Sequence, residues 1–371
     1  MTNMKIEART ILLLMCAALA LSSCNKKLPD TPVQEQQVPV GFRAMSQAVW
    51  VKSGETMFPY DDFGVWGIAR QGSNIYNLWG NDGLLKVEDL EHRVANNITT
   101  STTQRVFTPT EAAYWLRDYD YNFLALAPYN PTGLSNVNFT LAGATGNTTG
   151  KDYMTFTYDM SSKYAGIPAN GSTPAVAPDY TFDLLGAAAQ SGPVDGGRTD
   201  SQSLLFWHLF SQIEIKNIGF ATGINGTVTK VVFKAFPSGQ YTISYDNSAT
   251  NKTATTGVTC AAIDNIDAVK AELTFNNPNF SSSSTRPLFN IIPQAVQNFE
   301  LYIDFTINEG SSTAQYQGFK IDLTSQDLTE YEYNGKYNWD ITIGTKNAVS
   351  FNVVQINDWN TGTTPDEIPL Q

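Results

Sequence analysis

Alternation of apolar and polar residues with a period of two is the feature that most restricts how this chain can fold. Between Phe299 and Ile307 every odd position is apolar, and every even position except Tyr302 is polar. Successive side chains of a strand point to opposite faces of a sheet, so this pattern predicts a strand with one buried face. The same alternation recurs at residues 154–159, 213–216 and 339–343.

The composition favours strands over helices along the whole chain. Aromatic residues make up 12% of the chain and suit a pleated, half-buried surface, whereas charged residues, at 16%, are few for helical surfaces. Only residues 109–115 and 258–273 could hold helical turns, and residues 132–150 and 165–178 resemble long surface loops. Without the spacing of β-α-β units, these features predict an all-β fold of two antiparallel β-sandwiches.

The N-terminus has the layout of an export signal. Lys5 and Arg9 precede an apolar run over residues 11–21, which is too short to cross a bilayer of about 30 Å as a helix. The run ends at Leu21-Ser22-Ser23-Cys24, the pattern of a lipobox. We therefore expect residues 1–23 to be removed and Cys24 to carry the lipid that anchors the protein. The alternative is an ordinary signal peptide with a chance cysteine.

The length and charge of the exported protein limit its number of domains and its possible partners. Removal of residues 1–23 leaves 348 residues, enough for two domains at about 150 residues each. The formal charge of −12 becomes −13, because the removed segment carries a net charge of +1. This charge argues against nucleic acid as a partner. We expect a polar tether over residues 24–37 and, with residues 217–226 as a linker, domains over residues 38–222 and 223–371.

Ligands for a metal or a cofactor are scarce in the exported chain. Cys16 leaves with the signal and Cys24 is the expected lipid attachment site, so Cys260 is the remaining thiol. His92 lies in a polar stretch and is expected in solvent, whereas His208 lies in an apolar strand and is expected in the core. Cysteine and histidine zinc ligands are therefore too few. We expect no internal disulfide, no metal and no cofactor.

Catalytic motifs are also missing from the sequence. No G-x-S-x-G, P-loop or H-E-x-x-H motif occurs. Paired carboxylates at Asp61-Asp62, Asp118 with Asp120, and Asp366-Glu367 could serve glycoside hydrolysis or calcium binding, but acidic loops are common in a chain of this charge. We expect no enzyme. Trp79, Tyr76 and Tyr60 could stack on sugars, which leaves a monomeric glycan-binding lipoprotein of the outer membrane as an alternative function.

A series of short motifs follows the lipobox in a recognisable order. The motifs are VPVGF at residues 38–42, FGVWG at 63–67, YW at 114–115, FLALAPY at 123–129, DLLGA at 183–187, LFWHLFSQIEI at 205–215, IPQ at 292–294, GKY at 335–337 and the segment 354–359. Their order resembles that of the fimbrillins, the type V pilin subunits of Bacteroidota. The resemblance covers nearly the whole chain.

The resemblance implies a structural role on the cell surface. Fimbrillins have two transthyretin-like β-sandwich domains and are exported to the outer membrane as lipoproteins. In polymerising members an arginine-specific surface protease removes the first strand, and a C-terminal strand of a neighbouring subunit fills the groove, a form of β-augmentation. We therefore expect a shaft, tip or anchor subunit of a fimbria that contacts other fimbrial subunits and a ligand on a host or bacterial surface.

Two segments would carry this assembly. The displaced first strand would include Val38, Val40 and Phe42, with Arg43 as the candidate processing site. Polymerising members carry an arginine just after the first strand, but residues 44–51 contain none and Lys52 is the next basic residue. Cleavage after Arg43 would still remove residues 38–42. Without cleavage, the protein would stay lipid-anchored and cap or anchor a fimbria.

The candidate donor strand lies near the C-terminus. Its apolar residues are Phe351, Val353, Val354 and Ile356. The tail after it is a poor donor, because Pro365 and Pro369 cannot donate hydrogen bonds to a strand ladder. The alternative is that this strand completes the sheet of its own domain.

Overall fold

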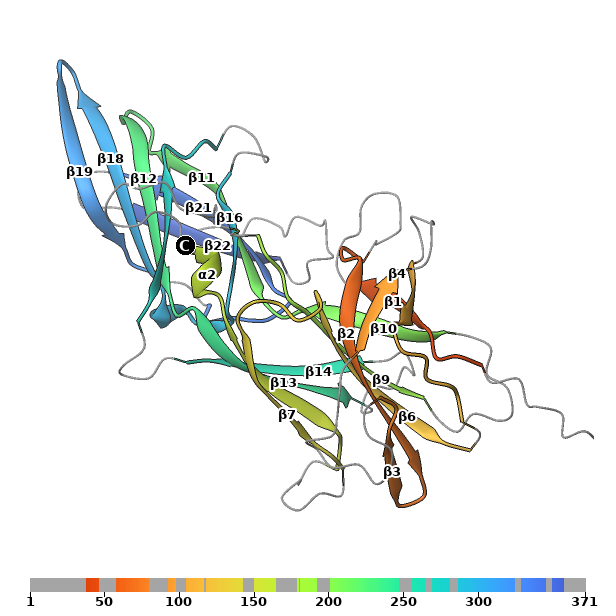
Figure 1. Ribbon diagram of the computed structural model, residues 1–371. Helices are drawn as coiled ribbons and strands as arrows, with labels where there is room; N and C mark the ends of the chain where they lie inside the picture. The colour runs from red at the N-terminus through yellow and green to blue at the C-terminus, as the bar shows by residue number, and fades with distance from the viewer. Residues whose placement is uncertain are drawn as a thin grey trace, which may run out of the picture.

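The computed structural model describes most of the chain between residues 38 and 356 (Figure 1). The described residues are 38–46, 58–79, 93–97, 105–116, 118–142, 150–164, 179, 181–191, 201–246, 255–263, 269–280, 286–323, 328–344 and 349–356. Their regular secondary structure is almost entirely strand, which confirms the predicted all-β fold. No helix in these ranges is long and apolar enough to cross a membrane.

The N-terminal strands form a large sheet that closes on itself. The sheet has the order β3-β2-β4-β5-β1-β10-β9-β6, and β2 also pairs with β6, which makes a barrel-like ring with β3 outside it. Its strands are β1 (Phe42–Ser46), β2 (Asp62–Gln71), β3 (Asn74–Asn77), β4 (Arg93–Asn97), β5 (Arg105–Pro109), β6 (Asp120–Ala127), β9 (Leu185–Ser191) and β10 (Gln202–His208). Closure leaves the ring without an unpaired edge.

A second sheet covers one side of this ring. It has the order β14-β13-β8-β7 and consists of β7 (Leu134–Thr140), β8 (Tyr153–Asp159), β13 (Ser238–Asp246) and β14 (Thr255–Ala262). Strand β2 is buried on both faces: Phe63 and Val65 face the interior of the ring, and Trp66 faces the second sheet. The ring centroids of Trp66 and Phe139 on β7 are 5.3 Å apart. The near-continuous apolar sequence of β2 follows from this double burial.

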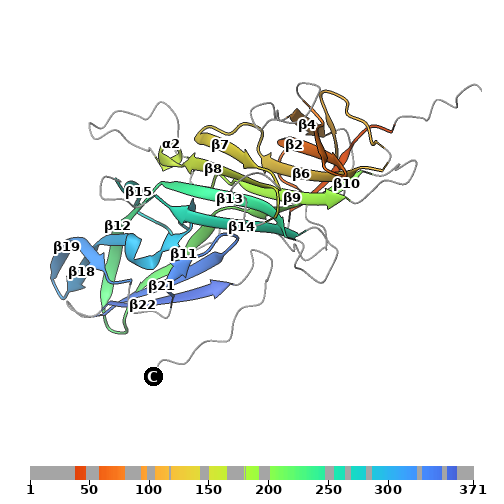
Figure 2. The same ribbon diagram turned by 90° about the horizontal axis from the view of Figure 1, so that it is seen from below.

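The C-terminal strands form a sandwich of two four-stranded sheets (Figures 1 and 2). One sheet has the order β16-β11-β21-β22, with β11 (Ser211–Phe220), β16 (Leu288–Ile291), β21 (Lys336–Ile343) and β22 (Val349–Ile356). The other has the order β15-β12-β18-β19, with β12 (Asn225–Ala235), β15 (Ala271–Asn276), β18 (Glu300–Glu309) and β19 (Ser312–Ile321). The minor elements are α2 (Ser161–Tyr164), β17 (Gln294–Ala295), β20 (Glu330–Tyr331) and the 3-10 helix η2 (Val296–Asn298).

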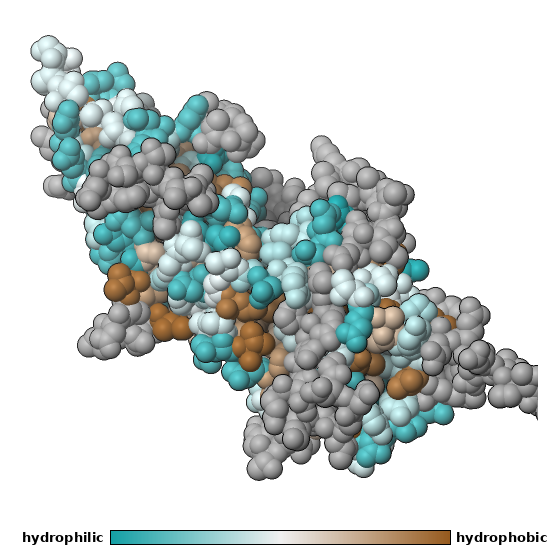
Figure 3. Space-filling model, viewed as in Figure 1, coloured by the Kyte–Doolittle hydropathy of each residue, from teal (hydrophilic) through white to brown (hydrophobic). Residues whose placement is uncertain are grey.

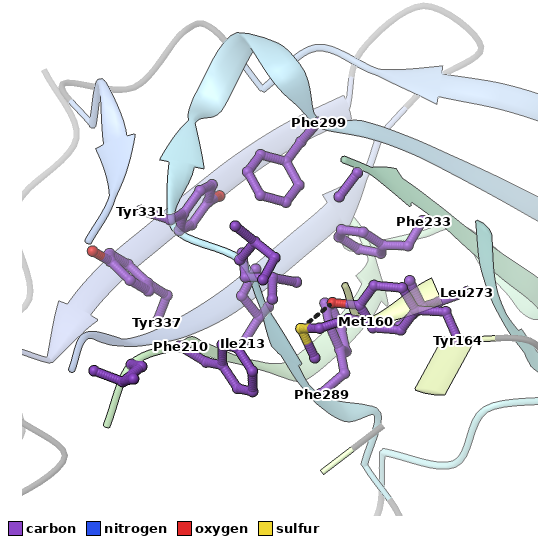
Figure 4. Packing of buried hydrophobic residues seen from close by; sticks show 14 of the residues in the cluster. Met160, Tyr164, Phe210, Ile213, Phe233, Leu273, Phe289, Phe299, Tyr331 and Tyr337 are labelled. Atoms are coloured by element: carbon purple, nitrogen blue, oxygen red, sulfur yellow. Dashed lines mark hydrogen bonds between the residues drawn. The ribbon is translucent and has the colours of Figure 1, made fainter. Parts of the chain in front are cut away.

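Aromatic residues fill the C-terminal sandwich (Figure 4). The Phe233 ring centroid lies 4.6 Å from that of Phe289 and 5.1 Å from that of Trp339, and all three side chains are buried. Figure 4 also shows Tyr164 reaching this core from α2, where its hydroxyl contacts the sulfur of Met160 at 3.3 Å. One apolar cluster contains these residues and those under the second sheet, so the two regions share a core.

Two strand pairings differ from the purely antiparallel prediction. Strand β1 pairs in parallel with β10, and β11 pairs in parallel with β21. Parallel neighbours need a crossover instead of a tight turn, and here the partners are far apart in the sequence, as with Phe42 and Gln202. Local alternation carries no information on such distant pairing, so the prediction was wrong at these two positions.

Two local predictions also need correction, and a third is tested only in part. Of residues 258–273, the described positions 258–263 and 269–273 hold the end of β14 and the start of β15, and a helical turn elsewhere in the segment stays a prediction. Residues 109–115 are not helical and include an isolated bridge between Tyr114 and Pro39. Residues 132–150, expected as a loop, contain β7, an edge strand of mostly exposed or half-buried residues. The alternation of apolar and polar residues in β7 is too weak to predict a strand from the sequence.

Strand pairing crosses the predicted boundary between residues 222 and 223. Strand β11 pairs with β21, and β13 returns after β12 to pair with β8. Residues 217–226, predicted as a linker, are instead the end of β11, a turn and the start of β12. In that turn the amide of Ala221 donates to the carbonyl of Ile343 (2.9 Å), which fixes it against β21. The division into domains 38–222 and 223–371 remains a prediction.

Candidate functional site

Strand β1 is one of the strands of the N-terminal ring and pairs with a neighbouring strand on each side. Phe42 pairs antiparallel with Phe107 of β5 and parallel with Gln202 of β10. The carbonyl of Gly41 accepts a hydrogen bond from the amide of Gln202 (2.8 Å). The first strand among the described residues is therefore not an edge strand, and its removal would expose two rows of unpaired backbone groups.

Alternate side chains of this segment enter the ring interior. Val40, Phe42 and Ala44 are at most 5% exposed, and Val38 is half-buried against the same cluster. The Phe42 ring centroid lies 5.1 Å from that of Phe123, and further contacts are with Phe63 (6.0 Å) and Trp79 (6.5 Å). The candidate displaced residues thus belong to the core of the ring, as their alternation suggests.

Residues 111–116, here called the clasp, hold the chain just before β1. The amide of Val40 donates to the carbonyl of Ala113 (2.8 Å), and the amide of Trp115 donates to the carbonyl of Val38 (3.0 Å). Trp115 packs edge-on against Tyr121, with centroids 4.8 Å apart. This pairing could not be predicted from the sequence, because the clasp and residue 38 are distant in the chain.

Arg43 lies inside β1, on the opposite parity to the buried residues. Its backbone pairs with Val106 on one side and Ser203 on the other, and its side chain is half-buried. A protease binds its substrate as an extended chain, so the bond after Arg43 becomes accessible only when β1 leaves the sheet. Lys52, the alternative processing residue, lies outside the described residues.

The candidate donor segment is strand β22, at the edge of its own sheet. It pairs antiparallel with β21, and its register includes Phe351 opposite Ile341, Val353 opposite Trp339, Val354 opposite Asn338 and Ile356 opposite Lys336. The structure therefore shows the arrangement considered as the alternative, in which this strand completes its own sheet. To act as a donor, β22 would first have to separate from β21.

His208 belongs to a buried cluster beside β1. It ends β10, its Nδ1 atom bonds the carboxylate of Asp183, and the Tyr60 hydroxyl donates to the carbonyl of Asp183. Burial, followed by the charge of Asp183, raises the pKa of Tyr60 far above its ordinary value. The cluster ties the segment before β2 to β10, which agrees with a packed role for His208. His92 lies outside the described residues.

The other candidate residues of the sequence have structural contacts. Asp61 forms an ion pair with Arg105 (2.9 Å), and Asp62 accepts the amide of Tyr129 (3.2 Å). Trp79, proposed for sugar stacking, is 2% exposed, and its indole donates to the carbonyl of Glu111 (3.0 Å). The described residues bring together no group of three His, Cys, Asp or Glu side chains that could hold a metal. Asp366 and Glu367 lie outside them.

A small cavity of about 150 Å³ lies between the ring and the second sheet. Asp152 lines it and is nearly buried. The Asp152 carboxylate bonds the guanidinium of Arg70 at two points, the amide side chain of Asn122 and the backbone amide of Ala142 (2.7 Å). These donors neutralise the carboxylate and join three segments. Nothing in the sequence around Asp152 distinguishes it from other acidic residues.

The sequence model of the fimbrillin-like family matches residues 54–359, more than half of the chain. The chain belongs to the fimbrillin-like family. This confirms the resemblance seen in the motifs. Fimbrillins are structural adhesion proteins of the cell surface and not enzymes, so membership supports a fimbrial subunit at that location.

Two of the solved structures that match the chain come from Bacteroides species. A fimbrial protein from Bacteroides vulgatus is 12% identical, with 87% of this chain and 99% of that chain covered and a TM-score of 0.48. A proposed cell adhesion protein from Bacteroides uniformis is 16% identical, with 88% and 99% covered and a TM-score of 0.45. No curated protein sequence matches the chain. The family assignment rests on the match over residues 54–359.

Proposed function

We propose that this fimbrillin is a fimbrial subunit that assembles when proteolysis removes its first strand. The observation that carries the proposal is the position of β1, which lies between β5 and β10 but comes from the N-terminal end of the fold. A cut after Arg43 removes the first two residues of β1 with the segment before them, and release of the remaining residues 44–46 then leaves a groove with two hydrogen-bonding edges. A strand of another subunit can fill that groove by β-augmentation.

The energetics favour refilling of the groove. Burial of a valine or phenylalanine side chain contributes about 1.5–3 kcal/mol, and Val40 and Phe42 are both fully buried. A domain is stable by only about 5–15 kcal/mol in total. A subunit without β1 therefore loses a large share of its stability until a second strand enters, and this loss drives assembly.

The remaining parts of the proposal concern anchoring and the donor. Cys24 carries the lipid that holds the precursor in the outer membrane, and an arginine-specific surface protease cuts after Arg43. The donor is β22 of the next subunit, which exchanges its pairing with β21 for the open groove. In a chain that is not cut, the same fold caps or anchors the fimbria, and adhesion to a host or bacterial surface ligand is a property of the assembled fibre.

The test uses protein that begins at residue 25, treated with an arginine-specific protease. We expect intact mass to show loss of the segment through Arg43, and negative-stain images to show oligomers or filaments. Arg43→Lys is the matched control, because lysine keeps the positive charge but is not a substrate. If this variant loses a segment of about the same length, the protease cuts at another residue and Arg43 is not the processing site. A wild-type protein that stays uncut and monomeric would contradict a role in the shaft.

A further inference from the structure

The outward face of the clasp is apolar. Ala113 and Trp115 point inward and are buried, whereas Ala112, Tyr114 and Leu116 alternate with them and are exposed. Tyr114 is 39% and Leu116 41% exposed, two of the four large hydrophobic residues that stand out among the described positions. A segment with one face in water normally carries polar residues there.

The neighbouring strand extends this apolar face. Pro39 pairs with Tyr114 in the isolated bridge and is also exposed. Pro39, Ala112, Tyr114 and Leu116 together are called the tether-side patch. Among the coloured residues on the face drawn in Figure 3, hydrophobic residues form small separate groups within a mostly hydrophilic surface. A contiguous apolar group marks a contact surface more often than single exposed residues do.

The position of this patch in the chain indicates what covers it. It adjoins Val38, whose carbonyl bonds the clasp, and the 14 residues 24–37 separate Val38 from the expected lipid at Cys24. A chain of that length spans at most about 50 Å even when fully extended. The tether-side patch of an acylated subunit therefore stays close to the bilayer.

The size of the tether-side patch and the charge around it indicate which kind of surface it contacts. A stable protein interface buries roughly 1,200 Å² or more, which the four side chains of this patch cannot supply. A tyrosine and a leucine suit the boundary between headgroups and acyl chains, where an aromatic ring is buried while its hydroxyl stays wet. Residues 111–120 contain three acidic residues and one arginine, so an anionic surface would be repelled.

We propose that the tether-side patch lies in the headgroup region of a zwitterionic phospholipid bilayer while the subunit is lipid-anchored. This inference rests on acylation of Cys24, which is part of the proposed function. The contact holds the ring end of the subunit at the membrane. Because Pro39 belongs to the segment that proteolysis removes, release of the first strand also breaks this contact.

The experiment uses the acylated protein in phosphatidylcholine vesicles, with acylation confirmed by intact mass. An environment-sensitive fluorophore is attached at Leu116→Cys in a Cys260→Ser background, and the matched control carries it at Val269→Cys, which replaces a residue that is 81% exposed and lies just before β15. We expect the label at position 116 to shift to shorter wavelength and to be largely quenched by brominated acyl chains. The label at position 269 should do neither.

Two outcomes would overturn the proposal. Equal emission and quenching at positions 116 and 269 in acylated protein would place the tether-side patch in water. Shielding at position 116 that grows with protein density, without quenching by lipid, would assign the patch to a second copy. A missing acyl mass would instead reject lipidation itself, which separates failure of the proposed function from failure of this inference.

Discussion

At the scale of single residues, buried polar groups fix the fold at places where apolar packing alone would not. Gln294 is 2% exposed, and its side chain bonds both backbone groups of Phe236 (3.0 and 3.1 Å) and the carbonyl of Ile292 (3.0 Å). The motif Ile292-Pro293-Gln294 is visible in the sequence, but its role is not. The amide acts as a bridge between the segment after β12 and the turn after β16.

Replacement of Gln294 with leucine should be strongly destabilising. Leucine is similar in size but leaves the buried amide and carbonyl of Phe236 without partners, which costs about 1–3 kcal/mol for each group. We expect urea denaturation to show a lower free energy of unfolding by about 2–4 kcal/mol. Gln315→Leu, at an exposed position on β19, is the control and should stay within about 0.5 kcal/mol of wild type. Equal stability of the two variants would refute the bridging role.

Cys260 gives a prediction for alkaline pH. Burial, the largest cause, raises the pKa of its thiol from 9.0 to about 12. Between these values the unfolded chain releases the proton while the folded protein keeps it, so the stabilising contribution is complete below pH 9 and is lost as pH rises through about 12. Cys260→Ser should therefore lose less stability than wild type from pH 8.5 to pH 11 in denaturant titrations. The same pH dependence of stability in both proteins would show that burial does not raise the pKa of the Cys260 thiol.

At the scale of elements, the first strand shows what local pattern can and cannot predict. Val38, Val40 and Phe42 alternate with residues of the other face, and the structure buries Val40 and Phe42 and half-buries Val38. The pattern also suggests one strand over residues 38–44, whereas the structure pairs residues 38–40 with the clasp and starts β1 at Phe42. Period-two alternation defines the faces of a strand, but its neighbours are set by distant residues.

The central position of β1 predicts that opening of this strand limits cleavage. Phe42→Ala removes a fully buried ring, which costs about 3–5 kcal/mol, and this destabilises the closed strand relative to the open one. We expect cleavage after Arg43 to become at least tenfold faster, as measured by the rate at which the trimmed mass appears under limiting protease.

The control for this prediction is Phe233→Ala, which opens a cavity of the same kind in the C-terminal sandwich. It lowers global stability but leaves the contacts of β1 intact, so local opening of β1 should be unchanged. Equal acceleration in both variants would mean that cleavage follows global unfolding. No acceleration with Phe42→Ala would mean that the cut lies outside β1.

At the scale of the whole molecule, the sequence predicts the all-β class but not the topology. Closure of the ring depends on pairing of β2 with β6, and β13 and β14 join β8 and β7 in the second sheet from beyond β12. These pairings join segments that are distant in the chain, so neither alternation nor turn residues indicate them. The same limit explains why the clasp and the Asp152 cluster were not predicted.

This topology predicts that the two predicted domains depend on each other. A fragment of residues 38–222 lacks β13, the partner of β8, and keeps β11 without its partner β21. We expect the fragment to be unfolded by circular dichroism, whereas the chain from residue 25 should unfold in one cooperative transition. A folded fragment, with two separate transitions in the longer chain, would support independent domains.

The central claim is that the place of β1 between β5 and β10 is taken by a strand of another subunit. Hydrogen exchange with mass spectrometry tests it directly, by following the amides of β5 and β10 in protease-treated, assembled protein and in uncut Arg43→Lys protein. The account predicts that these amides stay protected although the segment through Arg43 is gone. Rapid exchange of β5 and β10 in the assembled material, or retention of the original strand, would contradict it.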